Sequence, residues 1–310
     1  MQLPNLTDLL IEKIKETQNP TCVGLDTSLD YLPENMQSKC KNFKDVGKAI
    51  TEFNLNIIDK IKGVVPSVKV QIAYYEMYGI AGMEAFLATL EASKKAGLVV
   101  IADAKRNDIG STASCYSNAF LGKTKVSNNA FSAFPSDYLT VNGYLGSDGI
   151  EPFLADCRNH DKGIFVLVKT SNPSSGQLQN RKFENGETLF EAMAGLVNEW
   201  GKDTIGKYGY SNVGAVVGAT HPTEAEVLRK KLPNTLFLIP GYGAQGGKAD
   251  DLAVCFDQHG LGGVVNNSRG ILTAYKTDKF KGLNYADAAK AASEVMQQDI
   301  YTALKSKGKA

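Results

Sequence analysis

The sequence predicts an α/β fold, in which one domain forms a (β/α)8 TIM barrel. Eight short apolar runs rich in β-branched residues alternate with segments long enough for helices. Such alternation is typical of parallel strands joined by crossover helices, and eight strands suit a closed barrel. One large barrel can account for the whole length, so residues 1–310 are assigned to a single domain. A doubly wound open sheet is the alternative that the pattern leaves open.

The individual elements follow from the spacing of apolar residues. The predicted strands, in chain order, are 22–25, 68–72, 98–102, 138–141, 164–168, 213–217, 236–239 and 263–265. Helical spacing is found over an N-terminal segment, 5–17, and over 46–61, 82–96, 189–208, 224–231 and 250–258. Two connections, 115–136 and 171–187, are unusually long and are expected to be lids or surface insertions.

Composition excludes several classes of protein. The 34 Lys and Arg residues nearly balance the 33 Asp and Glu residues, which argues against a nucleic-acid or membrane surface. Five scattered cysteines without a Cys-x-x-Cys pair predict reduced thiols and a cytoplasmic location, with neither a disulfide framework nor a zinc site. The N-terminal segment lacks the apolar block of a secretory signal, and no stretch is apolar enough to span a bilayer.

The segment after the third predicted strand carries most of the chemical information. Asp103 and Lys105 stand two residues apart, so in an extended strand they project from the same face. Asp108 follows in the connection, close to the same ammonium or to a neighbouring subunit. Lys69 lies inside an apolar strand, where a buried charge is costly unless it is paired. A structural salt bridge would explain Lys69, but an alternating array of Lys69, Asp103, Lys105 and Asp108 favours a chemical site.

A glycine-rich loop, 241–247, follows the seventh predicted strand. It contains Gly-x-Gly-x-x-Gly, but a dinucleotide loop usually follows the first strand and finds an acid on the next one. Barrels often hold phosphate after strands seven and eight, where Arg269 could supply two parallel hydrogen bonds. We therefore expect a phosphate site, with a purely structural glycine turn as the alternative. Asp26, after the first strand, could cap a helix or bind a sugar hydroxyl.

Several of these features together resemble one enzyme family. Asp103-Ala104-Lys105-Arg106-Asn107-Asp108-Ile109, followed by Thr112, is similar to the signature of the orotidine 5′-phosphate decarboxylase family. The other matching features, in chain order, are Asp26, Lys69, Ser171-Asn172-Pro173, the 241–247 loop with Gln245, and Arg269. The resemblance extends over nearly the whole chain, and the chain length is similar to that of the larger-bodied branch of the family.

The resemblance implies a homodimeric barrel that converts orotidine 5′-phosphate (OMP) to uridine 5′-phosphate (UMP) in pyrimidine biosynthesis. It implies no metal and no organic cofactor. Lys105 would be the proton donor, and Asp103 would lie beside the substrate carboxylate. The remaining implied roles are ribose contacts for Asp26 and Lys69, a pyrimidine contact for Ser171, phosphate contacts for Gln245 and Arg269, and contacts to the partner's site for Asp108 and Thr112.

Three other functions remain as alternatives. A magnesium-dependent sugar-phosphate decarboxylase of the same superfamily shares the Asp-x-Lys-x-x-Asp pattern, but it has an acidic metal ligand where this chain has Lys69. An aldolase would use Lys105 as a Schiff-base nucleophile, whereas flanking acids favour a charged, less nucleophilic amine. A non-catalytic barrel that binds a nucleotide phosphate would not need the intact Asp103, Lys105 and Asp108.

Overall fold

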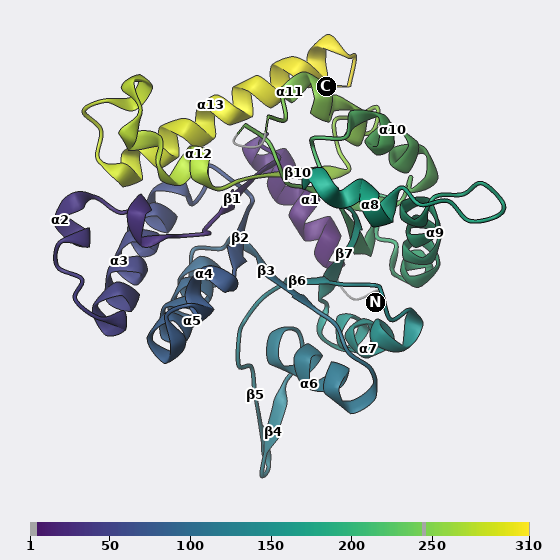
Figure 1. Cartoon of the computed structure of the whole chain (residues 1–310), viewed down its shortest axis with the longest axis horizontal. Coiled ribbons are helices and arrows are strands. Elements are labelled where there is room, and N and C mark those ends of the chain that lie inside the picture. Colours follow the sequence, from purple (N-terminus) through teal and green to yellow (C-terminus); the bar gives the residue numbers. More distant parts are fainter. Residues whose placement is uncertain (1–4, 244–245, 310) are drawn as a thin grey trace.

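The computed structural model describes residues 5–243 and 246–309 of the chain. Eight parallel strands close into one barrel in the order β1-β10-β9-β8-β7-β6-β3-β2, which confirms the predicted fold class. The strands run through the centre of the molecule, and helices surround them (Figure 1). The strands are β1 (Thr21–Gly24), β2 (Ser67–Gln71), β3 (Val99–Arg106), β6 (Tyr138–Val141), β7 (Gly163–Lys169), β8 (Ser211–Val217), β9 (Thr235–Ile239) and β10 (Gly263–Asn267).

Each of the six predicted helices overlaps a helix of the structure, and seven further helices in the described part of the chain were not predicted. Those that overlap a prediction are α1 (Leu6–Thr17), α3 (Phe43–Ile61), α5 (Gly79–Lys95), α9 (Leu189–Gly201), α10 (Pro222–Lys231) and α11 (Ala249–Leu252). Those that were not predicted are α2 (Glu34–Gln37), α4 (Ala73–Glu76), α6 (Gly110–Phe120), α7 (Glu151–His160), α8 (Gly176–Gln179), α12 (Arg269–Leu272) and α13 (Tyr285–Ser306).

Two differences from the prediction have visible physical causes. Helix α9 ends at Gly201 because β8 begins directly against it: a Cβ on Gly201 would lie 2.5 Å from the Ser211 Oγ, and that hydroxyl donates to the Gly201 carbonyl at 2.9 Å. Helix α13 has 22 residues but was missed, because its buried face is largely alanine and gives a weak apolar pattern. It packs against α3 on the outside of the barrel.

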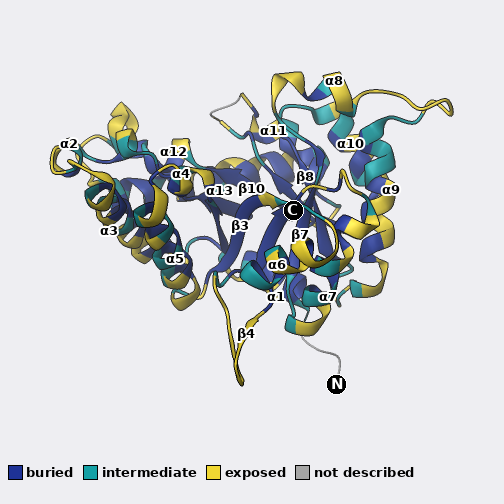
Figure 2. Cartoon of the chain, turned by 60° about the horizontal axis from the view of Figure 1, so that its bottom comes forward, coloured by how far each residue is buried: buried dark blue, intermediate teal, exposed yellow. Residues whose placement is uncertain are grey.

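The predicted long connection at 115–136 is not a single loop. It begins inside α6, whose serines and threonine hide the helical pattern, and it continues as an antiparallel hairpin of β4 (Thr124–Val126) and β5 (Asn129–Phe131). The hairpin projects away from the barrel, and its strands are fully exposed (Figures 1 and 2). The other connection, 171–187, contains a 3₁₀ turn, η3 (Pro173–Ser175), and the short α8 before it crosses the surface.

Helix α1 closes the amino-terminal end of the barrel. Leu6, Leu10 and Ile14 of this helix pack in one apolar cluster with Tyr138 and other residues of the barrel interior. The Thr7 hydroxyl also shares a 2.6 Å hydrogen bond with the Tyr138 hydroxyl. This end of the barrel is therefore sealed, which leaves the opposite end for ligands.

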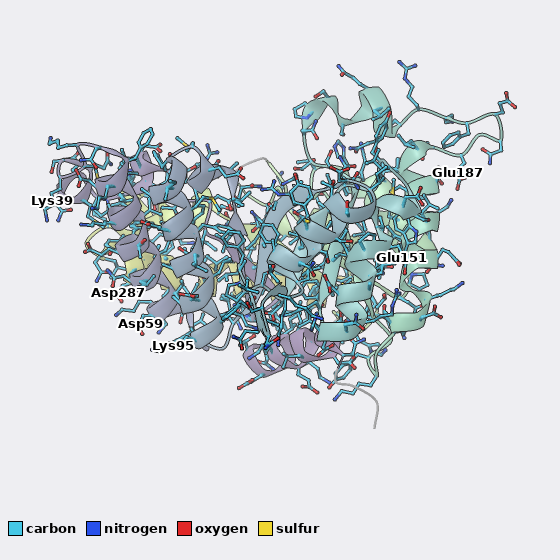
Figure 3. All side chains as sticks on the ribbon, turned by 90° about the horizontal axis from the view of Figure 1, so that it is seen from below. Lys39, Asp59, Lys95, Glu151, Glu187 and Asp287 are labelled. Carbon is cyan, nitrogen blue, oxygen red and sulfur yellow. The ribbon has the colours of Figure 1, made fainter. Side chains whose placement is uncertain are left out.

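Charged side chains lie mainly on the outer helices and loops. Lys39, Asp59 and Glu187, among those labelled in Figure 3, lie at the periphery of the molecule. The strands of the barrel, in contrast, are buried almost throughout (Figure 2). In the part of the chain that the structure describes, no helix is both long and apolar enough to cross a membrane.

Candidate active site

The carboxyl ends of the strands surround a cavity of about 600 Å³. All eight strands contribute to its wall, either with their own residues or with the residues that directly follow them. The polar strand ends do converge on one mouth, as a barrel requires. The lining residues used below are Asp26, Lys69, Asp103, Lys105, Thr140, Thr170, Ser171, Gly241, Asn266, Ser268 and Arg269.

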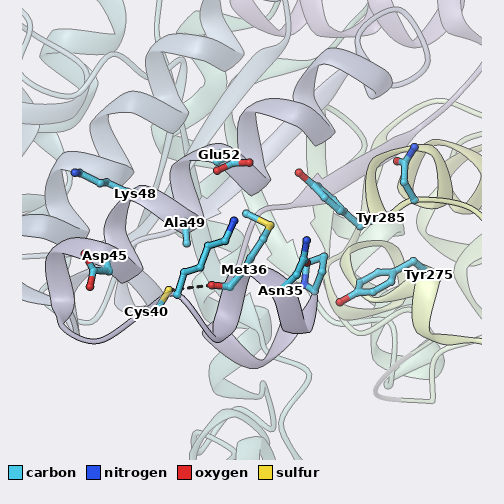
Figure 4. Close-up of a pocket in the computed structure, with 12 residues that line it drawn as sticks. Asn35, Met36, Cys40, Asp45, Lys48, Ala49, Glu52, Tyr275 and Tyr285 are labelled. Atoms are coloured by element: carbon cyan, nitrogen blue, oxygen red, sulfur yellow. Dashed lines mark hydrogen bonds between the residues drawn. The ribbon is translucent and has the colours of Figure 1, made fainter.

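A second cavity, of about 570 Å³, lies on the outside of the barrel (Figure 4). Met36, Cys40 and Glu52 line one side of it, and Tyr275 and Tyr285 line the other. None of its lining residues belongs to a barrel strand. The mouth of the barrel is therefore the stronger candidate for a catalytic site.

Four charged side chains form a continuous chain of ion pairs across the floor of the mouth. The Lys69 Nζ lies 2.8 Å from Asp26 Oδ1 and 3.0 Å from Asp103 Oδ2. The other oxygen of Asp103 is 2.7 Å from the Lys105 Nζ. Thr140, on the neighbouring strand β6, donates to the same oxygen at 2.8 Å. The order is thus Asp26, Lys69, Asp103, Lys105, so Asp26 extends the array at its Lys69 end. Asp108, which the sequence suggested for the Lys105 end, forms no ion pair with Lys105 within the described part of one chain.

The inner pair of this array stays ionised although it is buried. Burial alone would lower the pKa of Lys69, but the carboxylates of Asp103 and Asp26 outweigh it and hold that pKa above its ordinary value. Burial likewise would raise the pKa of Asp103, but Lys69 and Lys105 hold it well below the usual range. A fixed anion and a fixed cation therefore face the cavity at neutral pH.

Strand β3 is irregular where it delivers these residues. Its pairing with β6 shifts in register between Ala102 and Arg106, and Lys105 has a φ of 48°, in the left-handed region. The Lys105 backbone N–H donates to the Thr140 Oγ1 at 2.9 Å, which holds this conformation. A strained conformation of this kind is common at functional sites. The pattern in the sequence predicted the Asp103–Lys105 pairing but not the shift.

Asp26 is held by the residue that directly follows the last strand of the barrel. Ser268 donates to its second carboxylate oxygen at 2.7 Å. This contact requires a glycine at position 24, because a Cβ there would lie 1.9 Å from the Ser268 Oγ. Beside it, the buried Asn266 Oδ1 has no hydrogen-bond partner among the described residues. No role was predicted for Thr140, Asn266 or Ser268, although each stands in or after a barrel strand, where polar residues in an apolar run are the available signal.

The loop after β9 and the start of α12 form one side of the mouth. Gly241 and Gly243 have φ values of 102° and 68°, which other residues rarely adopt, and the Gly247 N–H closes the turn on the Gly241 carbonyl at 3.1 Å. Gly241 lines the cavity together with the exposed Arg269. Gln245, the other predicted phosphate ligand, lies outside the described residues.

Ser171 also lines the cavity, on the loop that follows β7. Asp108 and Thr112 do not line the cavity of their own chain. The Asp108 carboxylate accepts the Ile109 N–H at 2.8 Å, and Thr112 is exposed on α6. Within residues 5–243 and 246–309, there is no group of three His, Cys, Asp or Glu residues that could hold a metal ion.

Comparison with known proteins agrees with this geometry. The family model described as orotidine 5′-phosphate decarboxylase / HUMPS family matches residues 20–279, a span that contains every barrel strand and the ion-pair array. The chain belongs to this family. The resemblance inferred from Asp103 to Thr112 is thereby confirmed.

Two relatives that are more than 40% identical to this chain carry the same name. A protein of Caldicellulosiruptor bescii, named orotidine 5′-phosphate decarboxylase, is 43% identical over 97% of this chain and 99% of its own length. A protein of Rhodopirellula baltica with the same name is 44% identical over 93% of this chain and 96% of its own length. Among solved structures, the OMP decarboxylase of Leishmania donovani superposes with a TM-score of 0.72 at 28% identity, over 97% of this chain and 99% of that one.

Proposed function

We propose that this family member is a carboxy-lyase that converts OMP to UMP in pyrimidine biosynthesis. The observation that carries the proposal is the array of Asp26, Lys69, Asp103 and Lys105 at the mouth of the barrel. A cytoplasmic location is part of the same proposal, because the reaction supplies a soluble nucleotide. The names of the relatives support this reaction, which is also the one that the array suits chemically.

The chemistry requires a fixed cation beside the reacting carbon. Loss of carbon dioxide leaves an electron pair on a ring carbon that no carbonyl group can delocalise, so stabilisation must come from preorganised charge. The Lys105 ammonium is the most exposed member of the array and is suited to stabilise this carbanion and then protonate it. Asp103, which stays anionic, would lie beside the departing carboxylate. Asp103 repels the negatively charged carboxylate of the substrate. Carbon dioxide carries no charge, so this repulsion ends as the bond to the ring carbon breaks.

The rest of the cavity suits a nucleotide. Asp26 and Lys69 would hold the ribose hydroxyls, and Ser171 would contact the pyrimidine. Arg269 would hold the phosphate together with Gln245. Phosphate contacts far from the reacting carbon would supply binding energy that orders the site around the ring. All of these roles use side chains of the protein, so the proposal includes no metal and no organic cofactor.

The magnesium-dependent alternative makes a different demand on the same residues. The Lys69 ammonium contacts both Asp26 and Asp103, and a divalent cation placed between these carboxylates would be repelled by it. We expect the purified protein to decarboxylate OMP at full rate after exhaustive chelation. Loss of OMP absorbance with and without chelator measures this, and activity that vanished with the chelator and returned with magnesium would support the alternative.

We further propose a homodimer in which Asp108 and Thr112 complete the partner's site. The supporting observation is that neither residue lines the cavity of its own chain, although both follow β3 closely. A second observation is that Ile109, between them, is an exposed apolar residue. In the proposed dimer, the partner covers Ile109, and Asp108 lies beside the partner's Lys105.

Mixed dimers test the shared site. Lys105→Ala and Asp108→Ala chains should each be almost inactive when they are refolded alone. When they are refolded together, half of the dimers are mixed, and each mixed dimer has one intact site, so about a quarter of wild-type activity should return. Mass spectrometry establishes that mixed dimers form. If they form and stay inactive, Asp108 acts within its own chain and the shared-site model is wrong.

A further inference from the structure

The loop that carries Ser171 is fixed by a set of partly buried hydrogen bonds and one close backbone contact. The Ser171 carbonyl accepts a hydrogen bond from the Thr220 hydroxyl at 3.0 Å. Gln179 holds Thr170 from two sides, since its carbonyl accepts the Thr170 N–H at 3.0 Å and its amide donates to the Thr170 Oγ1 at 2.8 Å. Gly218 lets β8 approach so closely that a Cβ there would lie 2.7 Å from the Ser171 Cα. This loop is thus built to hold one position.

Lys169 lies at the centre of these contacts and is unused by the proposed reaction. It is the last residue of β7 and is only 1% exposed. Its Nζ donates to the Ser175 Oγ at 2.8 Å, at the end of η3, and it forms no ion pair within the described part of the chain. The Lys169 ammonium therefore has a hydroxyl as its hydrogen-bond acceptor, whereas the ammonium of the buried Lys69 contacts two carboxylates.

A buried ammonium without a carboxylate costs free energy, and its retention needs a reason. Burial lowers the pKa of Lys169, and the nearby charge of Glu224 only partly opposes this. The Ser175 hydroxyl is also shared with the His221 Nε2, 3.3 Å away, and His221 forms a hydrogen bond to the Thr170 backbone. Lys169 is thus connected, through Ser175 and His221, to Thr170, the residue that directly precedes Ser171.

We infer that Lys169 is a positioning residue: by anchoring Ser175, it fixes the turn that presents Ser171 to the substrate's pyrimidine ring. The turn is short, because only residues 170–174 lie between Lys169 and Ser175. Anchoring one end at β7 and the other at Ser175 leaves Ser171 little freedom to move. The inference rests on the proposed function, since it takes the ligand of Ser171 to be the pyrimidine.

A double-mutant cycle on kcat/KM for OMP tests this role. If Lys169 acts through Ser171, Lys169→Met should lower kcat/KM about tenfold in the wild type but less than about twofold in a Ser171→Ala background. A residue that only stabilises the fold would give equal effects in both backgrounds. Equal effects would overturn the inference, as would a Ser171→Ala variant with unchanged kcat/KM.

Two further variants make the result decisive. Lys162→Met is the control, because Lys162 directly precedes β7 at the end opposite to Lys169, and its Nζ contacts the Ser136 carbonyl at 2.6 Å and Asp137 Oδ1 at 3.4 Å. It should lower stability without changing kcat/KM. If Lys169→Met does not fold, Ser175→Ala removes the anchor with a smaller change and should show the same dependence on Ser171.

The cycle can also be measured without turnover. Calorimetric titration with UMP gives the dissociation constant of each variant, and the same loss of additivity is expected there. If the wild type bound UMP but did not decarboxylate OMP, the proposed reaction would fail while the binding cycle still tested Lys169. Additive effects on UMP binding would overturn the role of Lys169 even in an active enzyme.

Discussion

The two ends of the barrel differ in the side chains that fill them: apolar side chains at one end and charged side chains at the other. At the amino-terminal end, α1 closes the barrel with an apolar cluster that includes Leu6, Leu10 and Ile14, and its polar Thr7 is fully bonded. At the carboxyl-terminal end, the strands finish in charges, such as Lys69 and Asp103, that had to be paired inside the protein. The first arrangement lowers the free energy of the folded state, whereas the second keeps charge ready for a ligand.

The same contrast is found within a single strand, where one end contributes to stability and the other to function. Strand β3 begins with Val99 and Ile101 in the apolar cluster below and ends with Asp103 and Lys105 in the ion-pair array above. A buried ion pair contributes little net stability, because desolvation offsets the attraction. Substitutions at the two ends should therefore separate activity from stability.

The largest separation is expected at Lys105. Lys105→Ala should lower kcat by about 10⁴-fold, since it removes both the proton donor and the cation beside the carbanion. The free energy of unfolding, measured with urea, should change by less than about 1 kcal/mol, because Asp103 keeps its contacts with Lys69 and Thr140. The surface variant Lys62→Ala is the control for loss of a lysine. Near-normal turnover by Lys105→Ala would contradict the assignment of the proton donor.

The opposite result is expected at the other end. Leu10 is completely buried in the apolar cluster, so Leu10→Ala should lower the free energy of unfolding by about 2–5 kcal/mol. At temperatures where the variant stays folded, its kcat/KM should equal that of the wild type. Leu9→Ala, on the exposed side of the same helix, should change neither quantity appreciably. A loss of kcat/KM in the folded Leu10→Ala protein would mean that the two ends are coupled.

Arg269 should show an intermediate effect that is confined to one part of the ligand. Arg269→Ala should weaken UMP binding by about 1.5–3 kcal/mol, the contribution of a hydrogen bond to a charged group. Uridine, which lacks the phosphate, should bind the variant and the wild type equally. Calorimetric titration with both ligands measures this directly, and equal weakening for uridine would place Arg269 away from the phosphate.

The sequence predicted the closed end less fully than the open one. The charged triplet at Asp103 stood out because it followed an apolar strand, and the pairing of Asp103 with Lys105 and Lys69 is observed. In contrast, nothing in the pattern of residues 5–17 showed that this helix would seal the barrel. Apolar stripes predict that a face is buried but not the surface that buries it.

The sequence analysis also missed details of the site that depend on contacts between residues far apart in the chain or on the pairing of two strands. Thr140 completes the coordination of Asp103, yet it lies inside an apolar run four residues long, where threonine is an ordinary strand residue. The left-handed conformation of Lys105 arises from the register shift between β3 and β6, which only the pairing of the two strands reveals. In the sequence, Lys169 is likewise only the polar residue at the end of a strand. Its contact with Ser175 is seen only in the structure.

The smallest expected effect is a pH dependence at the open end. Burial, and then the charge of Lys169, lowers the pKa of His221 below its ordinary value near 6.5, while Glu224 and the Thr170 backbone oppose this. Above about pH 6.5, the imidazole is neutral in both states, and the folded protein keeps its full stability. Below that pH, the unfolded chain takes up the proton first, so the free energy of unfolding falls as the pH falls through the folded-state pKa.

The free energy of unfolding by urea should therefore differ less between pH 7.5 and pH 5.5 for His221→Gln than for the wild type. His259→Gln, which changes an exposed histidine far from this network, should keep the wild-type dependence, and an identical dependence in His221→Gln would show that this histidine does not contribute.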